Sequence, residues 1–180
     1  MPAYETINAV LQTSMREYLS ASKLSLDFAK PADWGQEVGH PLGFASALLL
    51  FCVVDAIGSY HHGSKITFPV NGKECTIRST GFQHFFVLNG PRYFGQALSH
   101  AAIKELYDSL RSGLAHNATI LPMAEILFDP HEPELFPVRN NRHAVNLFQL
   151  HNRAIGAVET FLNSQHAEGS LALKNMLLKS

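Results

Sequence analysis

The stretch AAIKELYDSLRSGLAH, residues 101–116, is the part of the sequence that decides the fold. Its large apolar side chains recur at the spacings that place residues on one face of an α-helix, and they are Ile103, Leu106, Tyr107, Leu110 and Leu114. The stretch therefore predicts an amphipathic helix with one buried face.

Similar patterns predict helices on either side of this stretch. Residues 44–59 are apolar nearly all round, which is typical of a buried helix. Residues 4–24 and 144–162 each carry one apolar face. These faces comprise Ile7, Val10, Leu11, Tyr18 and Leu19 in the first segment, and Leu147, Leu150, Ile155, Val158 and Phe161 in the second. We also expect shorter helices over residues 81–88, 93–100 and 170–178, with a break at Asn89-Gly90-Pro91.

Residues 60–80 depart from the helical pattern. Apolar residues alternate before and after Asn71-Gly72, a pair that favours a tight β-hairpin turn because both residues tolerate a positive φ. Pro69 restricts the first strand to a sheet edge. We expect a loop over residues 30–41. The proline-rich segment 118–142 excludes a long helix, and we expect residues 123–128 and 134–138 to pair as short strands. The sequence as a whole predicts a mainly α, up-and-down bundle of five or six helices with a small β-hairpin insertion, in one domain over residues 1–180.

Composition excludes several classes of protein. The chain has 180 residues, 46% of them hydrophobic and 16% charged, which excludes an intrinsically disordered chain. The net charge of −1 excludes a globally basic nucleic-acid coat, although residues 61–120 hold six basic and three acidic side chains and are the third that would best receive an anion. Two cysteines give no disulfide scaffold, and we expect a cytoplasmic protein with reduced thiols, no secretory signal and no membrane segment.

Arg111 and His116 are the best candidates for chemistry. They lie at the end of the amphipathic helix, where a protonated imidazole is favoured. Five residues of an ideal α-helix turn through about 500°, so the two side chains point about 140° apart. For them to act together, the helix must end or bend near Gly113, or two copies of the chain must meet.

The segment LYDSLRSGLAHNA, with Arg111-Ser-Gly-Leu-Ala-His116 at its centre, resembles the HEPN superfamily of helical-bundle domains. Members carry an Arg, four to six residues and then a His at a helix end. The resemblance is sharp over residues 103–118 and architectural elsewhere. The residue after Arg111 is Ser112, where many active members have Asn, Asp or His.

The resemblance implies a metal-independent endoribonuclease that needs no cofactor and works as a homodimer. The 2′-hydroxyl of RNA would attack the adjacent phosphate and leave a 2′,3′-cyclic phosphate. His116 would act as general base or acid and Arg111 would hold the phosphate. Tyr107, Ser112 and Asn117 would contact the substrate. The alternative is a non-catalytic module that binds RNA, a nucleotide or a protein such as an antitoxin, within a toxin–antitoxin or defence system.

Each of four other groups of residues allows two interpretations. His61-His62 would bind a metal only with a further ligand such as His84 or Asp55, and we expect loop histidines instead. The acidic segment 129–134 is expected to be a solvated loop. Arg142 and Arg153 would share a helix face if that helix began early, although an ordinary solvated surface is favoured. The aromatic side chains near residues 82–94 are expected in the core: Phe82, Phe85, Phe86, Tyr93 and Phe94.

Overall fold

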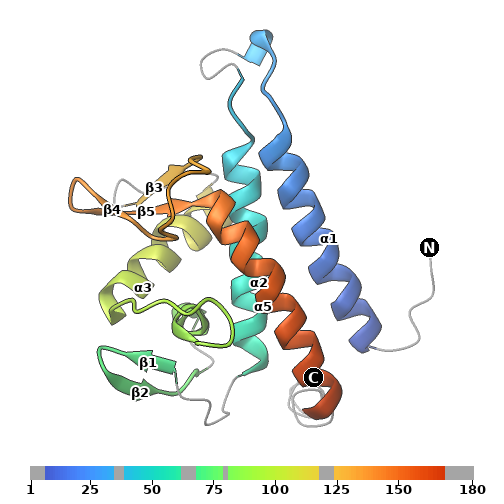
Figure 1. The fold of residues 1–180 in the computed structure, drawn as a ribbon, viewed down its shortest axis with the longest axis vertical. Helices are drawn as coiled ribbons and strands as arrows, with labels where there is room; N and C mark the ends of the chain where they lie inside the picture. The colour runs from blue at the N-terminus through green and yellow to red at the C-terminus, as the bar shows by residue number, and fades with distance from the viewer. Residues whose placement is uncertain (1–6, 35–38, 62–67, 79–80, 118–123, 169–180) are drawn as a thin grey trace. The chain divides into compact units, whose positions relative to one another are not determined.

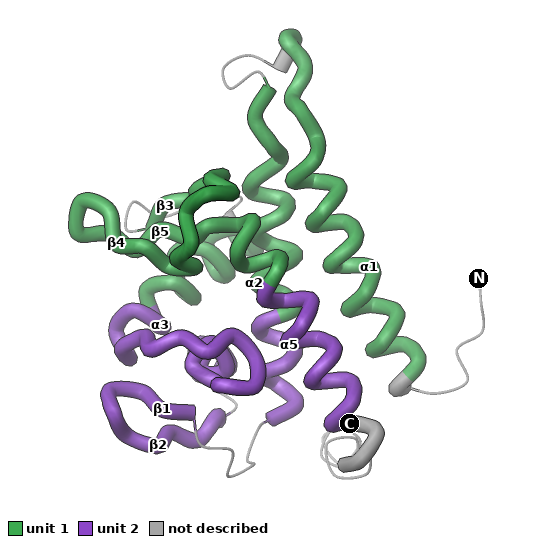
Figure 2. Tube along the Cα trace, in the orientation of Figure 1, with its two compact units in different colours: residues 1–53, 105–152 green, residues 54–104, 153–180 purple. Residues whose placement is uncertain are grey.

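The structure, a computed structural model, describes residues 7–34, 39–61, 68–78, 81–117 and 124–168. The protein is mainly α-helical, as expected, with two small β-sheets (Figure 1). Its residues form two compact units, one of residues 1–53 and 105–152 and the other of residues 54–104 and 153–180 (Figure 2). The expected helix over residues 170–178 lies outside the described residues.

In the first unit, α1 (Ile7–Asp27) runs beside the first part of α2 (Gly43–Tyr60), and both helices confirm the expectations from the sequence (Figure 1). The hydroxyls of Ser22 and Ser46, both fully buried, are hydrogen-bonded at 2.9 Å. The described residues between the helices, 28–34 and 39–42, lie in the expected loop, which includes the short 3₁₀ helix η1 (Ala32–Trp34). The loop is closed by a backbone bond from the Leu42 N–H to the Ser25 carbonyl.

The buried face of α1 differs from the expected one. Val10 and Tyr18 are exposed, whereas the fully buried side chains include Met15, Ser22 and Leu26. The sequence pattern missed Ser22, because a pattern of large apolar residues cannot anticipate a small polar residue in the core. Ser22 is accommodated there because its hydroxyl is paired with Ser46.

A three-stranded sheet in the same unit was only partly expected. β5 (Arg142–Asn146) is the central strand, parallel to β3 (Ala124–Leu127) and antiparallel to β4 (Val138–Arg139). β3 and β4 lie in the two segments that were expected to pair with each other, and each of them pairs with β5 instead. Residues 144–146 were expected to be helical, but they belong to this buried central strand.

α5 (Leu147–Glu168) consequently begins three residues later than expected. Asn146 sets the boundary, because its Oδ1 accepts a hydrogen bond from the Phe148 N–H at 3.2 Å, as a helix N-cap residue does. Near the start of α5, the buried His151 ring lies 3.1 Å from the Leu19 carbonyl of α1. α5 and α1 are thus joined within the first unit.

The second unit contains the expected hairpin. β1 (Phe68–Val70) pairs antiparallel with β2 (Lys73–Cys75), and the turn residues Asn71 and Gly72 both have positive φ. Pro69 is tolerated because this sheet has only two strands. The expected strand residue Ile66 lies outside the described residues.

Two helix expectations in this unit need correction. Residues 81–89 are helical, but as the 3₁₀ helix η2 (Gly81–Asn89). Residues 93–99 are not helical, because the chain turns at residues 91–94 and the buried Asn89 side chain then binds both backbone groups of Leu98. The Asn89 amide donates to the carbonyls of Pro69 and Leu98, and its Oδ1 accepts from the Leu98 N–H. The nearby aromatic side chains are mostly core, as expected, since Phe85, Phe86 and Phe94 are buried.

The helix expected over residues 101–116 is a continuous run of three segments. α3 (His100–Leu106) leads into the π-helical segment η3 (Tyr107–Ser112), which leads into α4 (Gly113–Asn117). The helix expected over residues 101–116 is therefore confirmed, with a π-helical middle.

One helix, α2, is long and apolar enough to meet the length and composition criteria for crossing a membrane, and half of it is buried within the protein. Core helices of soluble proteins meet the same criteria.

Gly58 of α2 offers a test of the packing in the second unit. A Cβ there would lie 2.2 Å from the His84 carbonyl oxygen of η2, so we expect Gly58→Ala to lower the free energy of unfolding by about 1–3 kcal/mol. Gly156 of α5 is the matched control, because no atom lies within 4 Å of its Cβ position. Gly156→Ala should raise stability by up to about 1 kcal/mol. Equal losses in urea denaturation of the two variants would contradict this packing.

Candidate functional site

The candidate residues of the Arg111–His116 motif lie on the π-helical segment η3 and on α4. A π-helix has hydrogen bonds between residues five apart, and here the Gly113 N–H donates to the Asp108 carbonyl. Such segments are rare, occur mostly as single turns inside α-helices and are frequent at functional sites. Tyr107, Arg111 and Ser112 all lie within this segment.

The π-helical segment has a packing consequence. In a strict α-helix, side chains eight residues apart differ by about 80° in direction. The wider π turn reduces this drift between Leu106 and Leu114, and Leu106, Leu110 and Leu114 are all buried. The apolar face predicted from the sequence is thereby kept in the core.

Gly113 does not bend the helix. Its φ of −58° and ψ of −49° are ordinary helical values, and α4 continues beyond it to Asn117. Only the first part of the interval from Arg111 to His116 lies in the widened segment. Most of the angular separation between the two side chains therefore remains within one chain.

The candidate residues differ in exposure. His116 is exposed, whereas Arg111, Ser112 and Tyr107 are half-buried and Ser109 between them is buried. Asn117 ends α4, and its side chain is outside the described ones. A half-buried guanidinium has less freedom to lose when it binds a phosphate, and an exposed imidazole is accessible to a substrate.

An imidazole–carboxylate pair that the sequence did not reveal lies just before η3. His143 of the central strand β5 places Nδ1 3.3 Å from the Glu105 carboxylate. These residues are 38 positions apart in the chain, and no local pattern joins them. The pair connects the sheet to the helix that carries Arg111, within the first unit.

His61 lies in the turn that follows α2, as expected of a loop histidine, but its side chain is buried in the core. Its ring is only 4% exposed, donates to or accepts from the Tyr93 hydroxyl at 2.7 Å, and lies within about 6 Å of the rings of Phe68 and Phe161. Burial lowers the pKa of His61 to about 4, so the ring is neutral at pH 7. His62 lies outside the described residues.

The two residues considered as further ligands of a metal, His84 and Asp55, are hydrogen-bonded to each other. His84 Nδ1 lies 2.8 Å from Asp55 Oδ1, and both side chains are mostly buried. Within the described residues, no three His, Cys, Asp or Glu side chains are grouped so that they would hold a metal ion.

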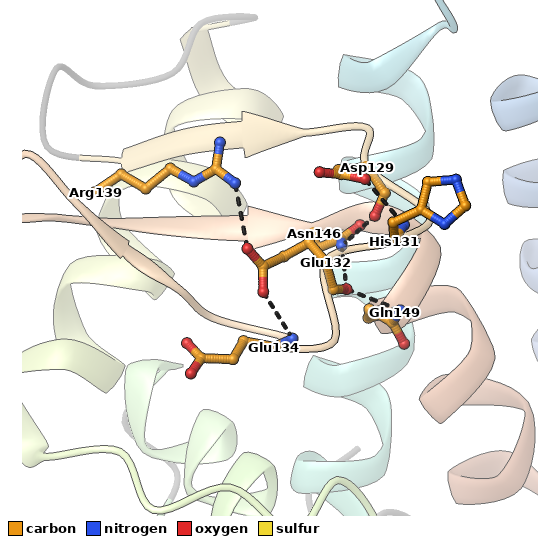
Figure 3. A network of polar contacts seen from close by, with 7 residues as sticks. All are labelled: Asp129, His131, Glu132, Glu134, Arg139, Asn146 and Gln149. Carbon is orange, nitrogen blue, oxygen red and sulfur yellow. Dashed lines mark hydrogen bonds and ion pairs between the residues drawn. The ribbon is translucent and has the colours of Figure 1, made fainter.

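The acidic segment 129–134 is a loop with mostly exposed residues, as expected, and hydrogen bonds hold its path (Figure 3). The fully buried Asn146 side chain donates to the carbonyls of Asp129 (2.6 Å) and Glu132 (3.0 Å), and Gln149 also donates to the Glu132 carbonyl. The Glu132 carboxylate accepts from the Glu134 N–H and pairs with Arg139 at 3.2 Å. The carboxylate of Glu132 therefore stabilises the loop to which it belongs.

Three arginines near the start of α5 come from different elements. Arg142 belongs to β5 and Arg153 to α5, because the helix begins only at Leu147. The early helix start that a shared face would need is therefore not present, and both side chains are exposed. Arg139, the third arginine, is engaged by Glu132.

No family model, curated protein or solved structure matches this chain. The chemistry of its own residues is consequently the basis for any proposal of function.

The burial of His61 predicts a pH-dependent stability. In the unfolded chain the ring has its ordinary pKa of about 6.5, whereas in the folded protein it stays neutral until about pH 4. Between these two pH values only the unfolded chain binds the proton, so the free energy of unfolding should fall by about 3 kcal/mol as the pH drops from about 6.5 to about 4. Urea denaturation at pH 7 and pH 4.5 measures the slope. His61→Gln should flatten it, whereas Tyr93→Phe should lower stability and keep the slope, since burial is its cause. A slope unchanged in His61→Gln would contradict this assignment.

Asn146 predicts a second stability effect. Asn146→Ala should cost about 2–3 kcal/mol, because it removes the helix cap, takes the side-chain donor from the Asp129 carbonyl and leaves the Glu132 carbonyl with Gln149 as its one remaining side-chain donor. Asn146→Ser retains a capping hydroxyl and should recover about 1 kcal/mol. Thermal unfolding of the two variants measures the difference, and an Asn146→Ala variant as stable as the wild type would show that the network contributes nothing.

Proposed function

We propose that this chain is a HEPN-like, metal-independent endoribonuclease that acts in the cytoplasm as a homodimer. The finer description of the fold, an up-and-down bundle of five or six helices in one domain, is part of this proposal. The observation that carries it is the position of the motif: Arg111 lies in a π-helical turn, half-buried, and His116 is exposed at the end of the same helix.

The chemistry follows from the two side chains. RNA supplies its own nucleophile, so the protein must take the proton of the 2′-hydroxyl, return a proton to the leaving 5′-oxygen and stabilise the charge on the phosphate. A histidine titrates near neutral pH and suits the proton transfers. A guanidinium holds two phosphate oxygens at once. The reaction ends in a 2′,3′-cyclic phosphate and a free 5′-hydroxyl, and it requires neither a metal nor another cofactor.

A dimer supports the proposal geometrically. Because the helix does not bend at Gly113, Arg111 and His116 of one copy keep most of their angular separation. In the proposed two-fold dimer, Arg111 of one copy lies near His116 of the other copy. The site then does not require the two side chains of one chain to point toward each other. Tyr107, Ser112 and Asn117 would contact the RNA beside them.

The second candidate is a non-catalytic module that binds RNA, a nucleotide or a protein such as an antitoxin in a toxin–antitoxin or defence system. The separation of Arg111 from His116 supports it, because an arginine alone suffices to hold a phosphate. Ser112 directly after the arginine supports it as well.

Cleavage of single-stranded RNA in EDTA tests the first proposal. His116→Ala should reduce the cleavage rate by about 10²–10⁴-fold, the usual contribution of a general acid–base group. Arg111→Ala should reduce the cleavage rate as well. The matched control is His131→Ala, since His131 is also exposed but lies in the acidic loop, and this variant should cleave like the wild type. The product should carry a 2′,3′-cyclic phosphate, and an all-2′-deoxy substrate should stay intact.

Three results distinguish the candidates. Equal activity of wild type and His116→Ala would mean that the cleavage does not come from this site. Cleavage that requires a divalent ion would contradict the mechanism. RNA binding that is lost in Arg111→Ala, without any cleavage by the wild type, would favour the non-catalytic module.

A further inference from the structure

Two rings of the second unit remain open to solvent beside a buried aromatic side chain. His100, the first residue of α3, is exposed, and Phe82 of η2 is half-buried. Their ring centroids lie 5.3 Å apart with planes at 48°, and the His100 ring also lies 5.7 Å from the ring of the buried Phe86. All three belong to the same compact unit (Figure 2). Phe82 and His100 are called the ring surface below.

Both rings of the ring surface are held in place by neighbouring groups. Phe82 meets the Phe86 ring edge to face, with centroids 6.1 Å apart. The backbone at His100 is fixed as well, because the Ser99 hydroxyl accepts a hydrogen bond from the Ala102 N–H at 3.1 Å, as a helix N-cap does. Rings that are already ordered lose little conformational freedom when a planar group stacks on them.

The polar atoms of His100 are not used within the part of the chain that the structure describes. Its interactions there are the two ring contacts, and no hydrogen bond or ion pair engages its nitrogens. The buried His61, by contrast, is bonded to the Tyr93 hydroxyl. An imidazole has at least one N–H donor, so His100 can donate to a phosphate or a base edge while its ring is in contact with a base.

Positive charge dominates the part of the chain around the ring surface. Residues 54–104 contain five Lys and Arg against two Asp and Glu, and one of these carboxylates, Asp55, is bonded to His84. Arg78 is exposed and forms no ion pair among the described residues. It lies four residues before Phe82, and four residues of chain span at most about 14 Å. Its long side chain can therefore reach a phosphate that flanks a base stacked on Phe82.

An aromatic surface beside an unpaired cation suits one class of ligand. The bases of single-stranded nucleic acid stack on aromatic side chains, and their phosphates bind basic ones. An acidic peptide would use the cations alone, and an apolar partner would use the rings alone. The combination of two open rings with an excess of positive charge therefore favours single-stranded RNA.

We propose that the ring surface stacks on a base of single-stranded RNA, with Arg78 on a neighbouring phosphate. The inference rests on the proposed function for the identity of the ligand, and it gives Phe82 and His100 no part in the cleavage. Its experiment measures the binding of a strand that cannot be cleaved. A wild type that binds this strand but cleaves no RNA would end the nuclease proposal and leave this one standing.

A comparison of two strands isolates the stacking. One is a 2′-O-methyl oligonucleotide of about eight nucleotides, and the other is an abasic strand with the same number of phosphates. Phe82→Leu keeps an apolar side chain against Phe86 and removes the ring. In fluorescence anisotropy it should weaken binding of the first strand about tenfold or more and leave binding of the abasic strand within about twofold.

His100→Ala should show the same preference for weakening the strand that has bases. Because His100 is exposed, this variant gives the test a second route should circular dichroism show that Phe82→Leu disturbs the fold. The matched control for both is Phe44→Leu, which removes a ring that is 57% exposed on α2, in the first unit. This control should bind both strands like the wild type.

The phosphate contact has its own matched pair. Arg78→Gln should weaken both strands alike and reduce the slope of log affinity against log salt by about 0.7, since one phosphate contact is lost. Arg16→Gln removes the same charge at an exposed position of α1 and should change neither strand.

Four results would overturn the proposal. A wild type with equal affinity for the two strands would show that bases are not recognised. Phe82→Leu and His100→Ala variants that bind like the wild type would show that the ring surface is not used. A loss of affinity that the abasic strand shares would exclude stacking as its cause, and an equal loss in Phe44→Leu would show that the ring surface is not specific. RNA cleavage by the wild type alongside any of these results would leave the nuclease proposal in place.

Discussion

The hydrogen bonding of η3 is the constraint on which the account of this protein depends. Bonds between residues five apart widen the turn, and the widening keeps Leu106, Leu110 and Leu114 together in the core. The same turn contains Arg111. Gly113, which has no side chain, follows the turn at the point where the helix returns to α-helical geometry. Packing of the leucines and presentation of the arginine are therefore two results of one local change in the helix.

The sequence predicted the helices well where periodicity alone decides them. α1, α2, α5 and the helix that carries the motif are all present, as is the hairpin, whose Asn71-Gly72 turn is specified by two adjacent residues. The errors have a common cause. Residues 144–146 and 93–99 leave the helical pattern because Asn146 and Asn89, as single polar side chains, bind backbone groups that are distant in the chain. Apolar spacing contains no information about such bonds.

For the candidate site, the sequence provided the residue types but not their environment. The spacing of Arg111 and His116 was readable, whereas the π-helical turn between Tyr107 and Ser112 was not, since nothing in a local pattern distinguishes bonds across five residues from bonds across four. His61 shows the same limit, because its burial among aromatic rings comes from segments 32 and 100 residues away, with Tyr93 and Phe161. The contact of Glu105 with His143 is likewise a product of tertiary structure.

The most direct test of the central claim, that the helix end at Arg111 and His116 receives an RNA phosphate, is an NMR titration of the wild-type protein with a 2′-O-methyl oligonucleotide, which binds without being cleaved. The account predicts that amide signals from Tyr107 to His116 shift most, together with the side-chain signals of Arg111 and the His116 ring. Shifts confined to other surfaces, or none at oligonucleotide concentrations that saturate binding, would contradict it.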